Sequence, residues 1–211
     1  MVRVKICGIT NWADAQICID AGADSLGFNF YAKSPRYISP DDARAIIRRL
    51  PRHVLPVGVF VNAPLAGVLR IARRADLSML QLHGDEPPAI LRKLSEHFPV
   101  MKAFRMRPGF KLHQLARFSV ANAFLLDGFD SELRGGTGHT FHWRKAREAK
   151  KYGPIVIAGG LTPENIARAI VEADPFGADV CSGVEVRPGK KDPRRVLSLM
   201  KAVSRTRIHT T

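Results

Sequence analysis

No apolar run in the sequence approaches the roughly 20 residues that a helix needs to span a bilayer. The first residues, from Met1 to Lys5, alternate aliphatic and charged side chains and lack the apolar core of a signal peptide. The sequence therefore predicts a cytoplasmic protein without a membrane partner.

Cysteine is scarce and scattered. Cys7, Cys18 and Cys181 form no CxxC pair, and an odd set of this kind argues against both a disulfide framework and a zinc site. His83 has no second histidine or carboxylate at ligand spacing, so we expect no metal. Reduced thiols are the simplest interpretation of the three cysteines.

Acidic residues are also in short supply. The 211 residues carry 33 Lys and Arg against 19 Asp and Glu, a formal net charge of +14. Such an excess suits a nucleic-acid-binding protein or an enzyme that acts on anionic substrates. However, no long run of Lys and Arg is interleaved with aromatic residues, and most of the basic side chains fall on predicted helices. Charges in that position are usually solvated, which disfavours a nucleic-acid partner.

The chain does contain a regular alternation of short aliphatic strands and amphipathic helices. With 45% hydrophobic and 25% charged residues, it has an ordinary globular composition and enough length for one large core. Strands are expected at about residues 2–7, 24–30, 54–61, 79–82, 100–104, 123–126, 155–158 and 178–181. Helices are expected at about residues 11–21, 39–50, 62–75, 87–97, 112–118, 141–151, 162–173 and 192–203.

Eight strand–helix units with short connections and no break in composition predict an α/β fold, a (β/α)8 TIM barrel. We expect a single domain over residues 1–205 and a frayed tail over residues 206–211. An open, doubly wound sheet is the alternative, although no Gly-x-Gly-x-x-Gly motif follows the first strand.

The carboxyl ends of all strands meet on one face of such a barrel, where these folds place their chemistry. Cys7 ends the first strand there and is a candidate base or nucleophile, although a free cysteine often serves only as a small core residue. Lys5 stands two residues earlier and points to the same side of the strand, so its charge would favour the thiolate. Asp179 is a candidate partner for Lys5, because a barrel closes its last strand onto its first.

Two further strands end in groups that can move protons. Asp127 ends the sixth strand and is a candidate general acid, because apolar neighbours such as Leu126 favour a protonated carboxyl group. The alternative for Asp127 is the cap of a turn. His83 follows the fourth strand and is either a proton carrier or a structural histidine.

Three loops are suited to bind anions. Gly159-Gly160 and Ser182-Gly183 follow the last two strands, where barrel enzymes often bind phosphate through backbone N–H groups. The alternative is that these glycines only permit tight turns. Arg36 lies in a constrained loop after the second strand and suits a bidentate grip on a carboxylate, unless it is simply a surface arginine.

Several segments, in their order along the chain, resemble phosphoribosylanthranilate isomerases over residues 2 to about 200. The segments are Lys5–Thr10, Ser34–Tyr37, Val57–Asn62, Gln81–Glu86, Leu125–Asp127, Gly135–Gly138, Ala158–Leu161, Ser182–Glu185 and Pro188–Asp192. The resemblance implies a (β/α)8 fold and a step of tryptophan biosynthesis. That step is an Amadori rearrangement, which converts N-(5′-phosphoribosyl)anthranilate to 1-(2-carboxyphenylamino)-1-deoxyribulose 5-phosphate.

The resemblance also implies roles for individual residues. Cys7 corresponds to the general base of the family, Asp127 to its general acid and Arg36 to the residue that binds the anthranilate carboxylate. The loops Gly159-Gly160 and Ser182-Gly183 correspond to its phosphate site. Supporting roles are expected of Lys5, His83, Asp179 and Gly136.

The expected partner is a small phosphoribosyl substrate. No cofactor is expected, because the amine of this substrate supplies the electron sink. For the assembly, the resemblance implies a monomer or a weak homodimer.

The chain departs from the family pattern at two positions. His142 stands where the family often has the acid of Phe-Asp-Trp, and Cys181 replaces the first serine of Ser-Ser-Gly. The cysteine leaves one hydroxyl fewer near the phosphate. An aminoaldose isomerase of the histidine pathway is the alternative activity, but such sites resemble a pair of carboxylates, whereas the first strand here ends in Cys7.

Overall fold

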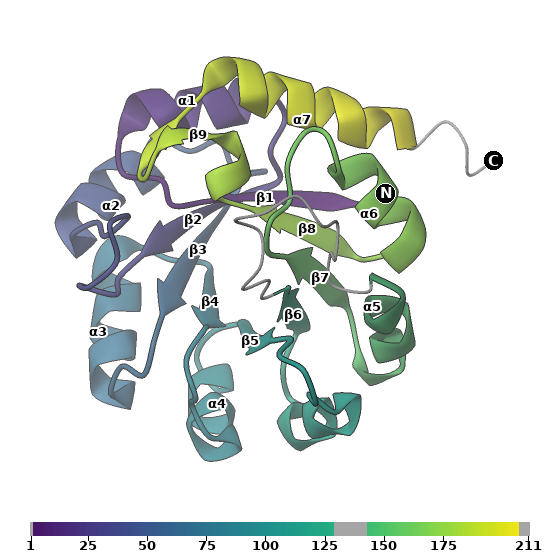
Figure 1. Ribbon diagram of the computed structural model, residues 1–211. Coiled ribbons are helices and arrows are strands. Elements are labelled where there is room, and N and C mark those ends of the chain that lie inside the picture. Colours follow the sequence, from purple (N-terminus) through teal and green to yellow (C-terminus); the bar gives the residue numbers. More distant parts are fainter. Residues whose placement is uncertain (1, 129–142, 207–211) are drawn as a thin grey trace.

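Eight parallel strands close into a barrel, and helices surround its wall (Figure 1). The computed structural model describes residues 2–128 and 143–206. The strands are β1 (Arg3–Cys7), β2 (Ser25–Asn29), β3 (Leu55–Phe60), β4 (Met79–Leu82), β5 (Val100–Arg105), β6 (Ala123–Asp127), β7 (Ile155–Ala158) and β8 (Gly177–Val180). The predicted barrel is confirmed, and the open sheet is excluded because β8 pairs with β1.

The helices follow the strands in the expected alternation. They are α1 (Trp12–Asp20), α2 (Pro40–Ile47), α3 (Leu65–Ala75), α4 (Pro88–Ser95), α5 (Trp143–Ala149), α6 (Ile166–Ala173) and α7 (Pro193–Thr206). A 3₁₀ helix, η1 (Leu112–Phe118), takes the place of an α-helix between β5 and β6, and η2 (Lys150–Tyr152) follows α5. In the part of the chain that the structure describes, no helix is both long and apolar enough to cross a membrane.

Several boundaries differ from the sequence expectation, and three of them illustrate the difference. The helix expected from residue 162 begins as α6 at Ile166, because the Asn165 side chain bonds to the Thr162 N–H and to the Gly160 carbonyl and shapes a turn there. The helix expected from residue 62 begins at Leu65, since Asn62 has a left-handed backbone with φ 51°. The last helix continues to Thr206 instead of ending near residue 203.

The stretch expected as a loop after the last strand has structure of its own. It forms η3 (Ser182–Val184) and then an antiparallel hairpin of β9 (Glu185–Arg187) and β10 (Lys190–Lys191). The hairpin lies at the same end of the barrel as the carboxyl ends of the strands, close to α1 (Figure 1). It therefore belongs to the face where the candidate site residues lie.

The core has two parts. Most buried apolar side chains lie between the barrel wall and the helices. A smaller cluster fills the barrel interior and contains Val57, Met101, Ala103, Ala123, Leu125, Val156 and Ala158. Cavities of about 280 Å³ and about 250 Å³ lie at the amino and carboxyl ends of the strands, respectively.

Candidate active site

The carboxyl-end cavity gathers most of the candidate residues from separate strands. Its lining includes Cys7, Arg36, His83, Asp127, Gly159, Gly160, Asp179 and Ser182. Lys5 lies deeper in the barrel and lines the cavity at the amino ends of the strands. Gly183 packs against Leu161 just outside the lining, and Gly136 lies outside the residues that the structure describes.

Lys5 contacts both Asp179 and Cys7 inside the barrel. Lys5 and Asp179 are register partners on β1 and β8, and the Lys5 Nζ atom lies 2.9 Å from each carboxylate oxygen. A Cβ atom added to Gly27 would lie 2.7 Å from the Cys7 sulfur and 2.8 Å from the Lys5 Nζ atom, so the thiol and the ammonium share the space above this glycine. Lys5 is therefore balanced by Asp179 and still lies beside Cys7.

The surroundings of Cys7 favour its thiolate. A hydrogen bond from Cys181 lowers the pKa of Cys7 well below its ordinary value, and the Lys5 and Lys191 cations add to this effect against the cost of burial. Burial alone would lower the pKa of Lys5, but Asp179 and Cys7 raise it above its usual value. The ammonium of Lys5 thus stays charged beside the sulfur.

We expect the Lys5 cation to control the reactivity of Cys7. Lys5→Met should move the pH midpoint of Cys7 alkylation upward and slow its labelling at pH 7 about tenfold or more, because the thiolate loses a neighbouring cation. Asp179→Asn should move the midpoint downward, since it removes an anion. The measurement is iodoacetamide labelling followed by peptide mapping, with Lys201→Met, at an exposed position of α7, as the control. Equal midpoints in all four proteins would contradict this assignment.

Asp127 is held by a histidine from another strand end. The His83 Nε2 atom lies 3.2 Å from Asp127 Oδ2, and the Gln81 side-chain amide donates to His83 Nδ1 at 2.9 Å. Since Nδ1 accepts, Nε2 carries the proton and donates to Asp127. The contact with Gln81 therefore orients the histidine ring, whereas the buried Gln81 Oε1 atom has no hydrogen-bond partner among the described residues.

A buried ion pair fixes the loop that carries His83. Lys102 on β5 donates to Glu86 at 2.8 Å and to the Gly84 carbonyl at 2.6 Å. Glu86 in turn accepts from the backbone N–H groups of Asn62 and Gly84. These groups tie the ends of β3, β4 and β5 together and hold His83 toward the cavity.

The two glycine loops pack tightly against their neighbours. Gly159 and Gly160 both have left-handed backbones, and a Cβ atom on Gly159 would lie 2.6 Å from Asp127 Oδ1 and even closer to the Gly128 carbonyl. A Cβ atom on Gly183 would overlap the Leu161 carbonyl. Glycine is therefore required at these positions, and Gly159 and Gly160 leave open backbone at the cavity.

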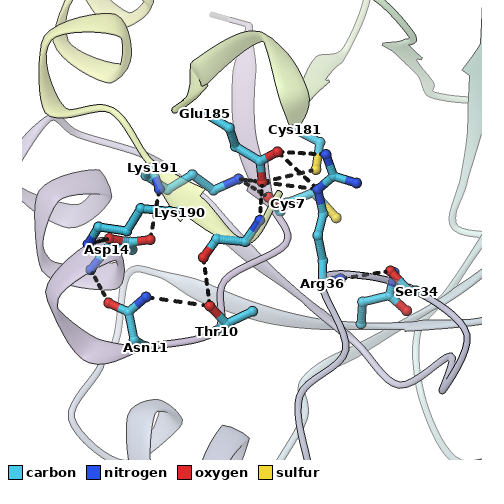
Figure 2. A network of polar contacts seen from close by, with 12 residues as sticks. Cys7, Thr10, Asn11, Asp14, Ser34, Arg36, Cys181, Glu185, Lys190 and Lys191 are labelled. Atoms are coloured by element: carbon cyan, nitrogen blue, oxygen red, sulfur yellow. Dashed lines mark hydrogen bonds and ion pairs between the residues drawn. The ribbon is translucent and has the colours of Figure 1, made fainter. Parts of the chain in front are cut away.

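Arg36 is already paired with a carboxylate. Its guanidinium binds Glu185 of the hairpin in a bidentate manner, with Nη2 2.6 Å from Oε2 and Nε 3.0 Å from both oxygens. Glu185 also accepts from Lys191 Nζ at 2.9 Å and from the Gly189 N–H (Figure 2). One carboxylate thus faces two cations, and the cluster of Arg36, Glu185 and Lys191 keeps a net positive charge.

The hairpin is fastened to the start of the chain. Asp14, fully buried on α1, accepts from Lys190 Nζ at 2.6 Å and from the Lys191 N–H at 2.8 Å (Figure 2). Lys191 Nζ donates to the Cys7 carbonyl at 2.5 Å, and its side chain is fully buried. Lys191 therefore connects the backbone of the candidate base to Glu185.

Sequence reasoning missed several residues of this site, among them Gln81, Glu185, Lys190 and Lys191. Glu185, Lys190 and Lys191 stand in segments that carry the family resemblance, but their spacing assigns them no partner. A signal was present for Gln81, because a polar residue in an apolar strand needs a hydrogen-bond partner.

The comparisons with known proteins agree with this arrangement. Residues 4–202 match the family model described as N-(5′-phosphoribosyl)anthranilate (PRA) isomerase. The chain is 50% identical over 200 residues to an N-(5′-phosphoribosyl)anthranilate isomerase of Citrifermentans bemidjiense, covering 95% of this chain and 96% of the relative. A relative of the same name from Pelobacter propionicus is 44% identical over 211 residues, the whole of both chains.

Solved structures give the same result in three dimensions. The phosphoribosyl anthranilate isomerase of Thermotoga maritima superposes with a TM-score of 0.90 at 43% identity, covering 97% of this chain and 99% of the other. A crystal structure of such an isomerase in complex with reduced 1-(o-carboxyphenylamino)-1-deoxyribulose 5-phosphate has a TM-score of 0.87 at 41% identity, with the same coverage. The chain therefore belongs to the phosphoribosylanthranilate isomerase family, whose members are enzymes of tryptophan biosynthesis.

Proposed function

We propose that this chain isomerises N-(5′-phosphoribosyl)anthranilate by an Amadori rearrangement, with Asp127 as the general acid and Cys7 as the general base. The observation that carries the proposal is the pairing of a stabilised thiolate on β1 with a carboxyl group on β6 across one cavity. Strands β7 and β8 separate the two groups, so each can reach a different part of one bound sugar.

The first step is ring opening. Asp127 protonates the furanose ring oxygen while the bond from C1′ to that oxygen breaks and the amine nitrogen forms a protonated imine. His83 orients the carboxyl group through the contact of Nε2 with Oδ2, which leaves Oδ1 for the substrate. His83 is thus a positioning residue in this proposal.

The second step is proton abstraction at C2′. The Cys7 thiolate removes this proton, and the electron pair moves into the protonated imine to give an enolamine. The enolamine then tautomerises to the ketone, with a proton added at C1′ and one lost from the C2′ hydroxyl group. The imine nitrogen acts as the electron sink, so the side chains need only exchange protons.

The anionic groups of the substrate have separate binding sites in this proposal. The backbone of Gly159-Gly160 and Ser182-Gly183 binds the phosphate, and the Arg36 guanidinium binds the carboxylate from the other side of the cavity. The reduced product analogue that a related isomerase binds carries both groups, which supports this division.

We expect Arg36→Met to raise KM for the carboxylated substrate by a factor of about 10–100, the size of a lost charge-assisted hydrogen bond. Glu185 keeps its ion pair with Lys191 in this variant, so no carboxylate is left buried alone. The measurement compares the anthranilate substrate with its aniline counterpart, which lacks the carboxylate. Wild type and Arg44→Met, a control at an exposed position, should prefer the anthranilate substrate. Arg36→Met should show no preference, and a retained preference would contradict the role of Arg36 in binding the carboxylate.

The decisive test of the proposed function is turnover by the purified chain. Consumption of the fluorescent anthranilate substrate should be rapid, while the aminoaldose substrate of the histidine pathway should not be consumed. Turnover of the histidine-pathway substrate alone would overturn the proposal in favour of the two-carboxylate type of isomerase.

A further inference from the structure

The candidate base has a second thiol beside it. Ile6 and Val180 are register partners on β1 and β8; Cys7 is the next residue of β1, and Cys181 directly follows β8. Neighbouring strands lie about 4.7–4.9 Å apart, within the Cα separation of about 4.4–6.8 Å that a disulfide spans. Both cysteines line the carboxyl-end cavity, so their side chains point to the same side of the barrel wall.

The two thiols are in contact. Cys181 is the largest influence that lowers the pKa of the Cys7 thiol, and the Cys181 sulfur lies 3.9 Å from the Glu185 carboxylate. Figure 2 shows both sulfur atoms beside the Arg36 guanidinium. The third cysteine, Cys18, is fully buried on α1 and does not line the cavity.

We propose that Cys7 and Cys181 form an oxidation site, at which a peroxide converts the two thiols into an intramolecular disulfide that reversibly stops the enzyme. Formation of the disulfide does not depend on the proposed function, because it rests on the positions and surroundings of the two thiols. The loss of activity rests on the proposed function, in which Cys7 is the base.

The chemistry balances with a peroxide as the oxidant. The Cys7 thiolate attacks one peroxide oxygen, the O–O bond breaks, and hydroxide leaves as Cys7 becomes a sulfenic acid. Cys181 then attacks the Cys7 sulfur, and the sulfenic hydroxyl group leaves as water with the proton of the Cys181 thiol. The two thiols lose two electrons and two protons, and hydrogen peroxide is reduced to two molecules of water.

The charges around the pair suit this order of events. The thiolate is the reactive form of a cysteine, and Lys5 and Lys191 favour it at Cys7. The hydrogen bond to Cys7 raises the pKa of Cys181, with burial acting in the same direction. Conversion of Cys7 to a neutral sulfenic acid removes the negative charge of the Cys7 thiolate. Lys191 and Arg36 then remain to stabilise a thiolate at Cys181.

The test is oxidation of the full chain with hydrogen peroxide, followed by alkylation, intact mass and peptide mapping. The expected result is the loss of two hydrogen masses, a Cys7–Cys181 linked peptide and one alkylated thiol at Cys18. Activity should fall about 100-fold or more, as expected for loss of a general base, and dithiothreitol should restore it. The proposal would be overturned if the peroxide-treated protein kept all three thiols, or if its Cys7 were found only as the sulfinic acid.

Two variants separate the proposal from other effects. Cys18→Ala should form the disulfide as wild type does, whereas Cys181→Ser should form none and should lose its activity in a way that dithiothreitol no longer reverses, because Cys7 oxidises further. Each activity is compared with that of the same untreated variant. A disulfide that forms without loss of activity would refute the reversible stop; if Cys7→Ala also stayed active, the proposed base would fail as well.

Discussion

Replacing Cys7 by alanine is expected to lower kcat by a factor of about 10²–10⁴ with little change in KM, the range that a positioned acid or base contributes. The change removes the proposed base and little else. The ion pair of Lys5 with Asp179 remains, and Lys191 donates to the Cys7 carbonyl, which alanine also has. Steady-state assay of the fluorescent substrate measures both constants.

The matched control for this loss is Cys18→Ala, which removes a thiol from the buried side of α1. Its burial raises the pKa of Cys18 to about 12, so this thiol stays protonated and has no role in proton transfer. We expect its kcat to stay near that of wild type. The reduced product analogue should bind Cys7→Ala as tightly as it binds wild type; unchanged kcat in Cys7→Ala would refute the proposed base.

Asp127→Asn should lower kcat by a similar factor of about 10²–10⁴, because an amide cannot protonate the ring oxygen. The amide oxygen still accepts the hydrogen bond from His83 Nε2, so the position of the histidine is retained. Binding of the reduced product analogue, measured by calorimetry, should therefore change little. A large loss of binding together with unchanged chemistry in single turnover would contradict the role of Asp127 as acid.

Asp76→Asn is a suitable control for the aspartate substitution. Asp76 is exposed at the end of α3 and has a left-handed backbone with φ 64°, a conformation that asparagine also tolerates. We expect this variant to keep the activity of wild type. A similar loss in both variants would point to a general effect of removing negative charge from this basic protein.

The fold could be predicted from the sequence because most strands are short, mainly apolar segments between polar loops. All eight expected strands overlap the observed ones, and residues 155–158 match without any shift. The helix boundaries were less accurate where side-chain hydrogen bonds to the backbone decide them. Asn165 forms a turn where Thr162 had the features of a helix start, and Glu86 accepts the N–H of Asn62 before α3.

The sequence was sufficient to predict which candidate residues stand at strand ends, but not most of the polar contacts that connect them. Cys7 and Asp127 stand at strand ends, and the topology brings strand ends together. The ion pair of Lys5 with Asp179 was also expected, because the last strand pairs with the first. The partner of Arg36 was not, since Glu185 lies 149 residues away in a hairpin that the sequence pattern does not indicate. Gly136 and His142 lie outside the described residues, and their roles stay predictions.

The order in which a ribosome makes the chain gives the hairpin a further consequence. Cys7 is synthesised well before Lys191, which bonds to its carbonyl and follows 184 residues later. At ordinary elongation rates this interval is about 10–40 s. During that time β1 lacks β8 beside it, and Asp14 lacks both of its partners from the hairpin. A nascent chain therefore cannot hold the proposed base in place until Lys190 and Lys191 have been synthesised, and we expect a product truncated before β9 to be inactive.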